Sequence, residues 1–205
     1  MRRMLPAGHH GLLVECDALE DVMSLHRALA ATRPPGVIDL VPAARTLLLT
    51  FDSTTTRAEL ETVVNRTGAG ETVAPEGQTE VVIPMTYDGG DLADVAELTG
   101  IPVDDVVRRH QAADYVVAFT GFAPGFAYIA GGDPALHVPR RTTPRTRVPA
   151  GSVALAGEFT GIYPREGPGG WQLVGRTDAV LWDLQREAPA LLTPGTRVRF
   201  AEVGS

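Results

Sequence analysis

Four arginines fall within eight residues of the sequence, in the segment RRTTPRTR at residues 140–147, which contains no acidic residue. Arginine presents a planar fork of donors that suits carboxylate and phosphate groups. Prolines in and beside the segment restrict its backbone, and a preorganised arginine loses less entropy when it binds an anion. The segment is therefore either a solvated basic loop or part of an anion-binding site.

A glycine-rich segment, REGPGGWQLVGRT at residues 165–177, follows this arginine cluster. Backbone N–H groups at Gly169 and Gly170 can form a nest for an anion. Trp171 offers a packing or stacking surface, and Arg176 adds a further guanidinium. Turn formation alone would explain the glycines equally well.

Glu158 ends the apolar run of VPAGSVALAGE and is the best candidate for a general base or for orienting a substrate amide. The alternative is an exposed acid at the end of a strand. Ser152 in the same run has no neighbouring base in the sequence, so we interpret it as a strand-end serine.

The basic residues are all arginine, 18 in number, and the sequence has no lysine. This excludes a Schiff-base lysine, a P-loop lysine and an amidase serine–lysine pair. Motifs of the G-x-S-x-G, H-E-x-x-H and C-x-x-C types are also absent. The sequence thus predicts neither a self-contained hydrolase nor a metal site, and any anion must be bound by arginine and backbone donors.

The net charge and the hydropathy of the chain argue against nucleic acids and membranes as binding partners. The formal net charge of −7 argues against binding to nucleic acid or to an anionic membrane surface. The single cysteine, Cys16, cannot form a disulfide within the chain. There is no run of about 18 apolar residues that would cross a bilayer. We expect a cytoplasmic protein.

The first half of the chain predicts a βαββαβ order. Strands are expected at residues 11–16, 36–42, 45–52 and 79–85, with helices at about residues 17–33 and 54–67. This is the pattern of a split-βαβ, ferredoxin-like domain, which we place at residues 1–84.

Residues 91–110 predict two helices joined by a turn at Gly100. In a DNA-binding helix-turn-helix the first turn of the second helix would face the major groove, but here it holds Asp104 and Asp105, which repel DNA. We favour a packed helical pair with Arg108, Arg109 and His110 at its end. From residue 115 onward, short apolar runs separated by glycine and proline predict a compact β-barrel or sandwich. The second domain is placed at residues 85–205.

Several motifs together resemble one known family. GFAPGFAYIAG, TPRTRVPAGSVALAGE, TGIYP and PGGWQLVGRT occur in the order and spacing of the family of B-type subunits of 5-oxoprolinase, also called allophanate hydrolase subunit 1 or KipI-like carboxyltransferase-domain proteins. The upstream segment IPMTYDGGDLADVAELTG is similar as well. The resemblance implies an α+β protein whose ferredoxin-like N-terminal domain precedes a cyclophilin-like β-barrel.

The resemblance also implies a function. The chain would be a subunit, inactive alone, of an ATP-dependent, ADP-forming 5-oxoprolinase that opens a small cyclic amide. Its partners would be a larger companion of the allophanate hydrolase subunit 2 type, which is the C-type subunit of 5-oxoprolinase, and a LamB/YcsF-type subunit, with ATP shared with or held by a partner. The site residues expected in this chain are Arg145, Arg147, Glu158, Tyr163, Gly169, Gly170, Trp171 and Arg176. Other members resemble inhibitors of a sensor histidine kinase, which is the alternative function.

Overall fold

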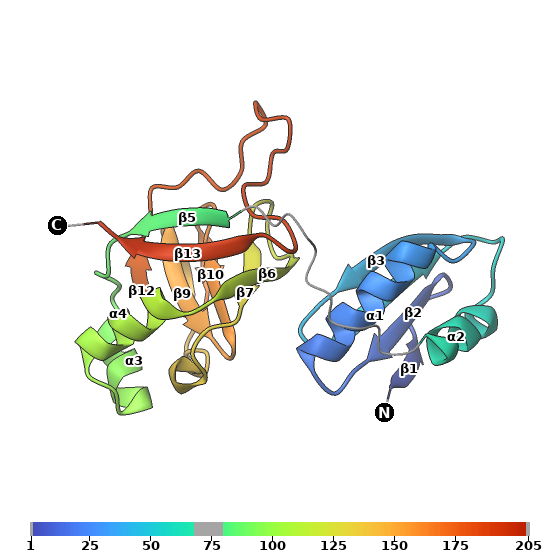
Figure 1. Ribbon diagram of the computed structural model, residues 1–205, viewed down its shortest axis with the longest axis horizontal. Helices are drawn as coiled ribbons and strands as arrows, with labels where there is room; N and C mark the ends of the chain where they lie inside the picture. Colours follow the sequence, from blue (N-terminus) through green and yellow to red (C-terminus); the bar gives the residue numbers. More distant parts are fainter. Residues whose placement is uncertain (1, 68–79, 204–205) are drawn as a thin grey trace. The chain divides into compact units, whose positions relative to one another are not determined.

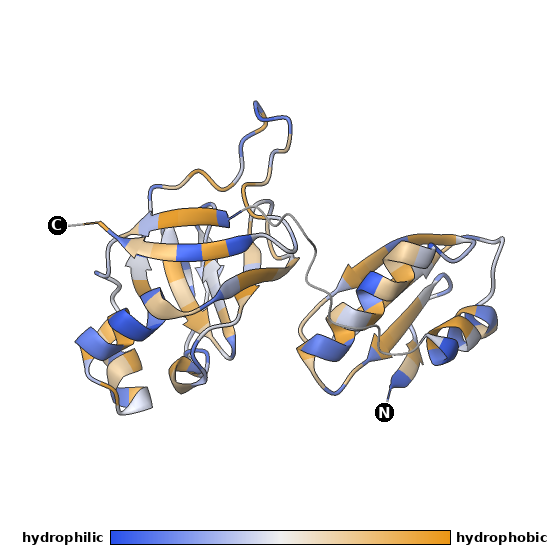
Figure 2. Ribbon diagram, viewed as in Figure 1, coloured by the Kyte–Doolittle hydropathy of each residue, from blue (hydrophilic) through white to orange (hydrophobic). Residues whose placement is uncertain are grey.

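The computed structural model describes residues 2–67 and 80–203. The chain divides into two compact units, Met1–Ala74 and Pro75–Ser205, and each has its own hydrophobic core. Figure 1 shows the elements of each unit, and Figure 2 shows apolar residues along the strands and helices. Among the described residues, no helix has the length and apolar character needed to span a membrane.

The first unit is an antiparallel sheet with two helices. Its strands are β1 (Arg3–Pro6), β2 (Gly11–Glu15), β3 (Val37–Pro42) and β4 (Thr46–Phe51), in the order β1-β2-β4-β3. Helices α1 (Leu19–Thr32) and α2 (Arg57–Arg66) pack on it. Their buried faces, which include Leu25, Leu29 and Leu60, meet Leu12, Leu47 and Leu49 of the sheet in one core.

The ends of these helices follow from local sequence. Helix α1 stops at Arg33, whose backbone is left-handed at φ +41°, directly before Pro34. Helix α2 begins with a capping box, in which Thr56 and Glu59 satisfy each other's backbone N–H groups. Both predicted helices are therefore confirmed.

The predicted ferredoxin-like arrangement is not reproduced at its last strand. The strand expected at residues 79–85 does not complete the N-terminal sheet, because β5 (Glu80–Met85) pairs in parallel with β13 (Arg197–Glu202) in the second unit. Strand β1 pairs with β2 at the edge of the first sheet instead. The predicted domain of residues 1–84 thus includes a strand of the second unit, because Ile83 and Met85 bury their side chains in that unit's core.

The second unit is a nearly closed barrel. Strands β6 (Tyr115–Thr120), β7 (Ala127–Ala130), β9 (Ser152–Ala156), β10 (Phe159–Ile162) and β12 (Gln172–Arg176) join β5 and β13 in a seven-stranded sheet ordered β12-β9-β10-β7-β6-β13-β5. Thr86 and Arg176 exchange two backbone hydrogen bonds of 2.9 Å, which link the two edges of the sheet. Of the two architectures left open by the strand pattern, the structure has the barrel.

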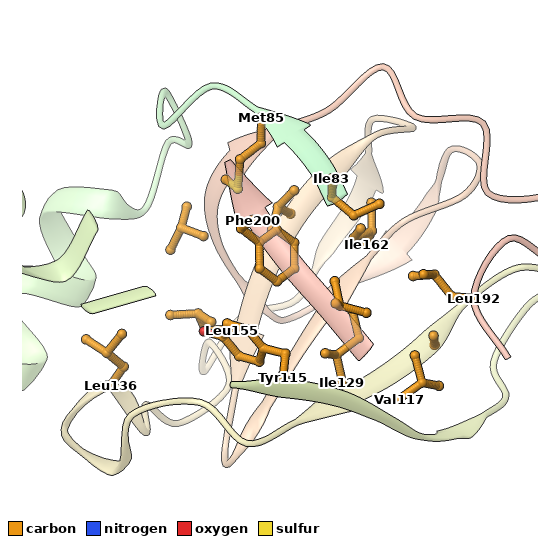
Figure 3. Packing of buried hydrophobic residues seen from close by; sticks show 14 of the residues in the cluster. Ile83, Met85, Tyr115, Val117, Ile129, Leu136, Leu155, Ile162, Leu192 and Phe200 are labelled. Carbon is orange, nitrogen blue, oxygen red and sulfur yellow. The ribbon is translucent and has the colours of Figure 1, made fainter. Parts of the chain in front are cut away.

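The barrel is filled by alternate side chains of its strands. Figure 3 shows Met85, Ile83 and Phe200 from the parallel pair facing Leu155 and Ile162 across the interior. Strands β8 (Arg145–Val148) and β11 (Gly167–Gly169) form a separate two-stranded ribbon. A short 3-10 turn, η1 (Pro134–Leu136), follows β7.

The predicted helical pair is confirmed as α3 (Leu92–Thr99) and α4 (Val103–Ala112). Gly100 ends α3 in the left-handed conformation, at φ +68°. Helix α4 packs against β13 and buries Val106 and His110, which are four residues apart on one helical face. The pair therefore covers the barrel.

Candidate functional site: an arginine–aspartate cluster beside an aromatic cluster

A buried carboxylate organises the arginine-rich segment. Asp91, directly before α3, is 1% exposed. Its Oδ1 accepts hydrogen bonds from Arg141 Nη1 and Arg145 Nη2, each at 2.6 Å, and its Oδ2 accepts from the Leu173 N–H at 2.7 Å. We call Asp91, Arg141 and Arg145 the arginine–aspartate cluster. It ties the start of α3 to β8 and β12.

The electrostatics of this cluster keep its members charged. Burial alone would raise the pKa of the Asp91 carboxyl, but the hydrogen bonds from Arg145 and Leu173 and the charges of both arginines bring that pKa below its ordinary value. The bond to Asp91 raises the pKa of the Arg145 guanidinium in turn. The arginine–aspartate cluster is therefore an ionised, preorganised unit.

Seven aromatic rings pack beside it. This aromatic cluster, centred on Phe126, consists of Phe119, Phe122, Phe126, Tyr128, Phe159, Tyr163 and Trp171. Most ring pairs meet edge to face, the favoured geometry for aromatic quadrupoles. Gly161 leaves room for them, because a Cβ there would lie 2.8 Å from both Phe126 and Trp171.

The two clusters adjoin. Gly169 pairs with Arg145 in the β8–β11 ribbon, and a Cβ at Gly169 would collide with the Tyr163 hydroxyl. The Gly170 carbonyl accepts the Arg141 N–H at 2.7 Å. The Arg140 guanidinium lies 5.9 Å from the centre of the Trp171 ring, within cation–π range.

The structure brings together five of the predicted site residues: Arg145, Tyr163, Gly169, Gly170 and Trp171. Tyr163 is buried, and burial raises the pKa of its hydroxyl. The close approach of the Tyr163 ring is sufficient to explain why residue 169 is a glycine, so no bound anion is needed to account for it. The use of these glycines as a nest stays a prediction.

Two predicted arginines, Arg147 and Arg176, are exposed and pair with other acidic residues. Arg147 Nε is 2.7 Å from Glu166 Oε2, and Arg176 Nε is 3.0 Å from Asp88 Oδ2. Arg176 also lines a pocket of about 450 Å³ with Thr86 and Thr177. In the described ranges, neither arginine forms a salt bridge with Asp91.

Glu158 occupies the tight turn between β9 and β10 and is exposed. Within residues 80–203 it has no hydrogen bond or salt bridge to any predicted arginine. The cavity that it lines with Tyr115 and Thr160 has a volume of about 10 Å³, which is room for at most one water. The predicted catalytic carboxylate is thus not assembled with the other site residues, and its role stays a prediction.

A second buried polar residue, His110, was not among the predicted site residues. Its Nδ1 lies 2.7 Å from the Tyr87 hydroxyl and its Nε2 lies 3.3 Å from Thr160 Oγ1. Burial lowers the pKa of the imidazole to about 3, so the ring is neutral. The apolar spacing from Val106 to His110 on α4 was the available signal for its burial.

The predicted residues do not fit ATP by themselves. Each predicted arginine has a carboxylate within 3.0 Å: Asp91 for Arg145, Glu166 for Arg147 and Asp88 for Arg176. A nucleoside triphosphate would have to compete with these acids for the guanidinium groups. The structure also places no group of three or more His, Cys, Asp or Glu side chains suited to a metal ion within its described part.

Comparison with known proteins gives the family. The protein-family model of the carboxyltransferase domain, subdomain C and D, matches residues 2–192 of this chain. The B-type subunit of 5-oxoprolinase from Escherichia coli O157:H7 is 40% identical over 171 residues, which are 81% of this chain and 78% of that protein. Its counterpart from Haemophilus influenzae is 44% identical over 60% of this chain and 60% of its own length.

Among solved structures, that of TTHA0988 matches all of this chain with a TM-score of 0.75 and 38% identity. The chain spans only 41% of the TTHA0988 chain. The family model covers most of the chain and a curated relative is 40% identical over 81% of it, so the chain belongs to the carboxyltransferase-domain family that contains the B-type subunits of 5-oxoprolinase.

Proposed function

We propose that this chain is a subunit of an ATP-dependent 5-oxoprolinase and that it acts with a companion subunit of the allophanate hydrolase subunit 2 type and a LamB/YcsF-type subunit. The observation that carries the proposal is the 40% identity to the B-type subunit of the E. coli 5-oxoprolinase over 81% of this chain. The reaction opens 5-oxoproline to glutamate with formation of ADP.

The charges of the site support a shared active site. The predicted arginines are neutralised by carboxylates of their own chain, so a triphosphate gains little from them alone. ATP is accordingly held by a partner subunit. When bound there, it supplies the phosphoryl group that activates the lactam carbonyl.

We assign the substrate carboxylate to Arg140. Among the described residues, Arg140 has neither a salt bridge nor a hydrogen-bond partner, and its contact is the face of Trp171. A guanidinium held over an aromatic ring keeps its N–H edge available for a bidentate bond to a carboxylate. Arg141 and Arg145, fixed by Asp91, position the segment from which Arg140 projects.

Replacement of Arg140 tests this assignment in the assembled enzyme. Arg140→Ala is expected to raise the KM for 5-oxoproline by about tenfold or more, the loss typical of a charge-assisted hydrogen bond of roughly 1.5–3 kcal/mol. The KM for ATP should change little. The matched control is Arg199→Ala, which removes another exposed arginine, on β13, whose salt-bridge partner is Glu80 on β5. Equal KM values for 5-oxoproline in the two variants would contradict the role of Arg140.

A further inference from the structure

A cavity of about 580 Å³ borders helix α4 in the second unit. Val103, Val107 and Gln111 line it at four-residue intervals, which places them on one face of the helix. The other walls come from Tyr87, from the start of α3 and from the end of β13. The volume lies within the range of about 300–1,000 Å³ that is typical of small-molecule pockets. Its described lining includes no member of the arginine–aspartate cluster or of the aromatic cluster, so it is not part of the site above.

A buried chain of hydrogen bonds orients the hydroxyl of Tyr87. This hydroxyl lies 2.7 Å from His110 Nδ1, and His110 Nε2 lies 3.3 Å from Thr160 Oγ1. The imidazole is neutral, and burial raises the pKa of the Tyr87 hydroxyl, so the phenol keeps its proton. The shorter distance is typical of a hydroxyl donor, whereas an N–H donor gives longer bonds. The Tyr87 hydroxyl therefore donates to Nδ1, and the imidazole proton lies on Nε2, which donates to Thr160.

The polar groups of the cavity walls are left mainly as acceptors. Because the Tyr87 hydroxyl gives its proton to His110, its oxygen keeps a lone pair for a further donor. Gln111 Nε2 donates to Glu202 Oε2 at 3.3 Å. This bond leaves the Gln111 side-chain carbonyl and the remaining lone pairs of the Glu202 carboxylate free to accept. Glu202 also raises the pKa of the Tyr87 hydroxyl, so its charge acts on the same oxygen.

The charge of the cavity walls is negative. Asp104 and Glu202 line the cavity and have no salt bridge to any described residue. Arg108, the cation on the described lining, donates to Asp105 Oδ1 from Nε at 3.2 Å and from Nη2 at 2.9 Å, so its charge is compensated locally. Acceptors and uncompensated carboxylates beside an apolar helix face suit a cation that carries several donors and an apolar body.

We propose that this cavity binds an organic ammonium ion, a primary amine with an aliphatic or aromatic body. The ammonium group has three donors and no acceptor, which matches the Glu202 carboxylate and the Tyr87 oxygen. The apolar body packs on Val103 and Val107 of α4. Carboxylates and phosphates are repelled by the same walls, so this ligand differs in class from 5-oxoproline and ATP. The inference goes beyond the proposed function and does not depend on it.

Titration of the full-length chain with 2-phenylethylammonium, followed by the amide signals in NMR spectra, tests the proposal. We expect saturable shifts of the signals of Val107 and Gln111. Two probes of similar shape serve as comparisons: 2-phenylethanol lacks the charge, and 3-phenylpropanoate reverses it. Each should bind at least about tenfold more weakly, because a hydrogen bond between charged groups is lost. Equal binding of the three probes, or no shift at these positions with the ammonium probe, would overturn the proposal.

Variants of the chain assign the binding to these walls. Glu202→Gln removes the charge but can still accept the bond from Gln111, and it should weaken binding of the ammonium probe by about tenfold. Tyr87→Phe removes the hydroxyl and should weaken it by about fivefold. Glu97→Gln is the control, since Glu97 is an exposed carboxylate of α3 that does not line the cavity. Glu202 is exposed as well, so the comparison of the two glutamates is independent of any effect of Tyr87→Phe on folding. Equal affinities of Glu202→Gln and Glu97→Gln would contradict the proposal.

Discussion

Asp91→Asn is expected to lower the free energy of unfolding of the second unit by about 3 kcal/mol, because it leaves two partly buried guanidiniums without a counter-charge. The carboxylate is almost fully buried and accepts hydrogen bonds from Arg141, Arg145 and the Leu173 backbone. Asparagine keeps the shape of the side chain but removes the charge. The expected loss is at the low end of the range for broken buried pairs, since both arginines retain some exposure.

Tryptophan fluorescence during urea unfolding measures this effect in the second unit. The two tryptophans of the chain, Trp171 and Trp182, are both in the second unit. Asp88→Asn is the matched control, because Asp88 pairs with Arg176 at the surface, and such pairs contribute about 0–1 kcal/mol. A difference between the two variants of less than about 1 kcal/mol would contradict the organising role of Asp91.

The stability of the second unit is expected to fall as the pH drops from 6.5 toward 3, with His110 as the main cause. The folded state holds the imidazole at a pKa of about 3, against an ordinary value of 6.5. Between these values the unfolded chain binds a proton that the folded chain does not, so stability rises with pH throughout this window. The slope approaches about 1.4 kcal/mol per pH unit for one proton.

His110→Gln should flatten this slope, whatever its effect on stability at pH 7. The amide can still bond to Tyr87 and Thr160 but does not titrate. His137→Gln, at an exposed histidine of the same unit, is the control for the substitution of histidine by glutamine. His26 also has a pKa lowered by burial, but it lies in the first unit, which contains no tryptophan. An unchanged slope in His110→Gln would assign the pH dependence to other groups.

Local patterns predicted the helices and the barrel but not every strand partner. The capping box at Thr56 and the left-handed Gly100 are encoded within a few residues, so the helix ends could be found. The alternating run of β5 identifies a strand but not its sheet, because a parallel partner more than 100 residues away determines that choice. The four residues of β1 were too few to be recognised.

The candidate site was predicted only in part, because contacts between residues distant in sequence cannot be found from local patterns. Motif resemblance selected Arg145, Tyr163 and Trp171, which the fold does bring together. It could not show that Asp91, 54 residues before Arg145, neutralises the arginines. It also could not show that Glu158 lies in a turn apart from them, since that depends on the direction in which the β9–β10 hairpin leaves the barrel.

The central claim is that this chain completes a 5-oxoprolinase. The most direct measurement is glutamate formation from 5-oxoproline and ATP by the companion and LamB/YcsF-type subunits, with and without this chain. We predict that neither the chain alone nor the two partners alone form glutamate, and that the three together do so with consumption of ATP. Robust activity of the isolated chain, or equal activity of the partners in its absence, would contradict the claim.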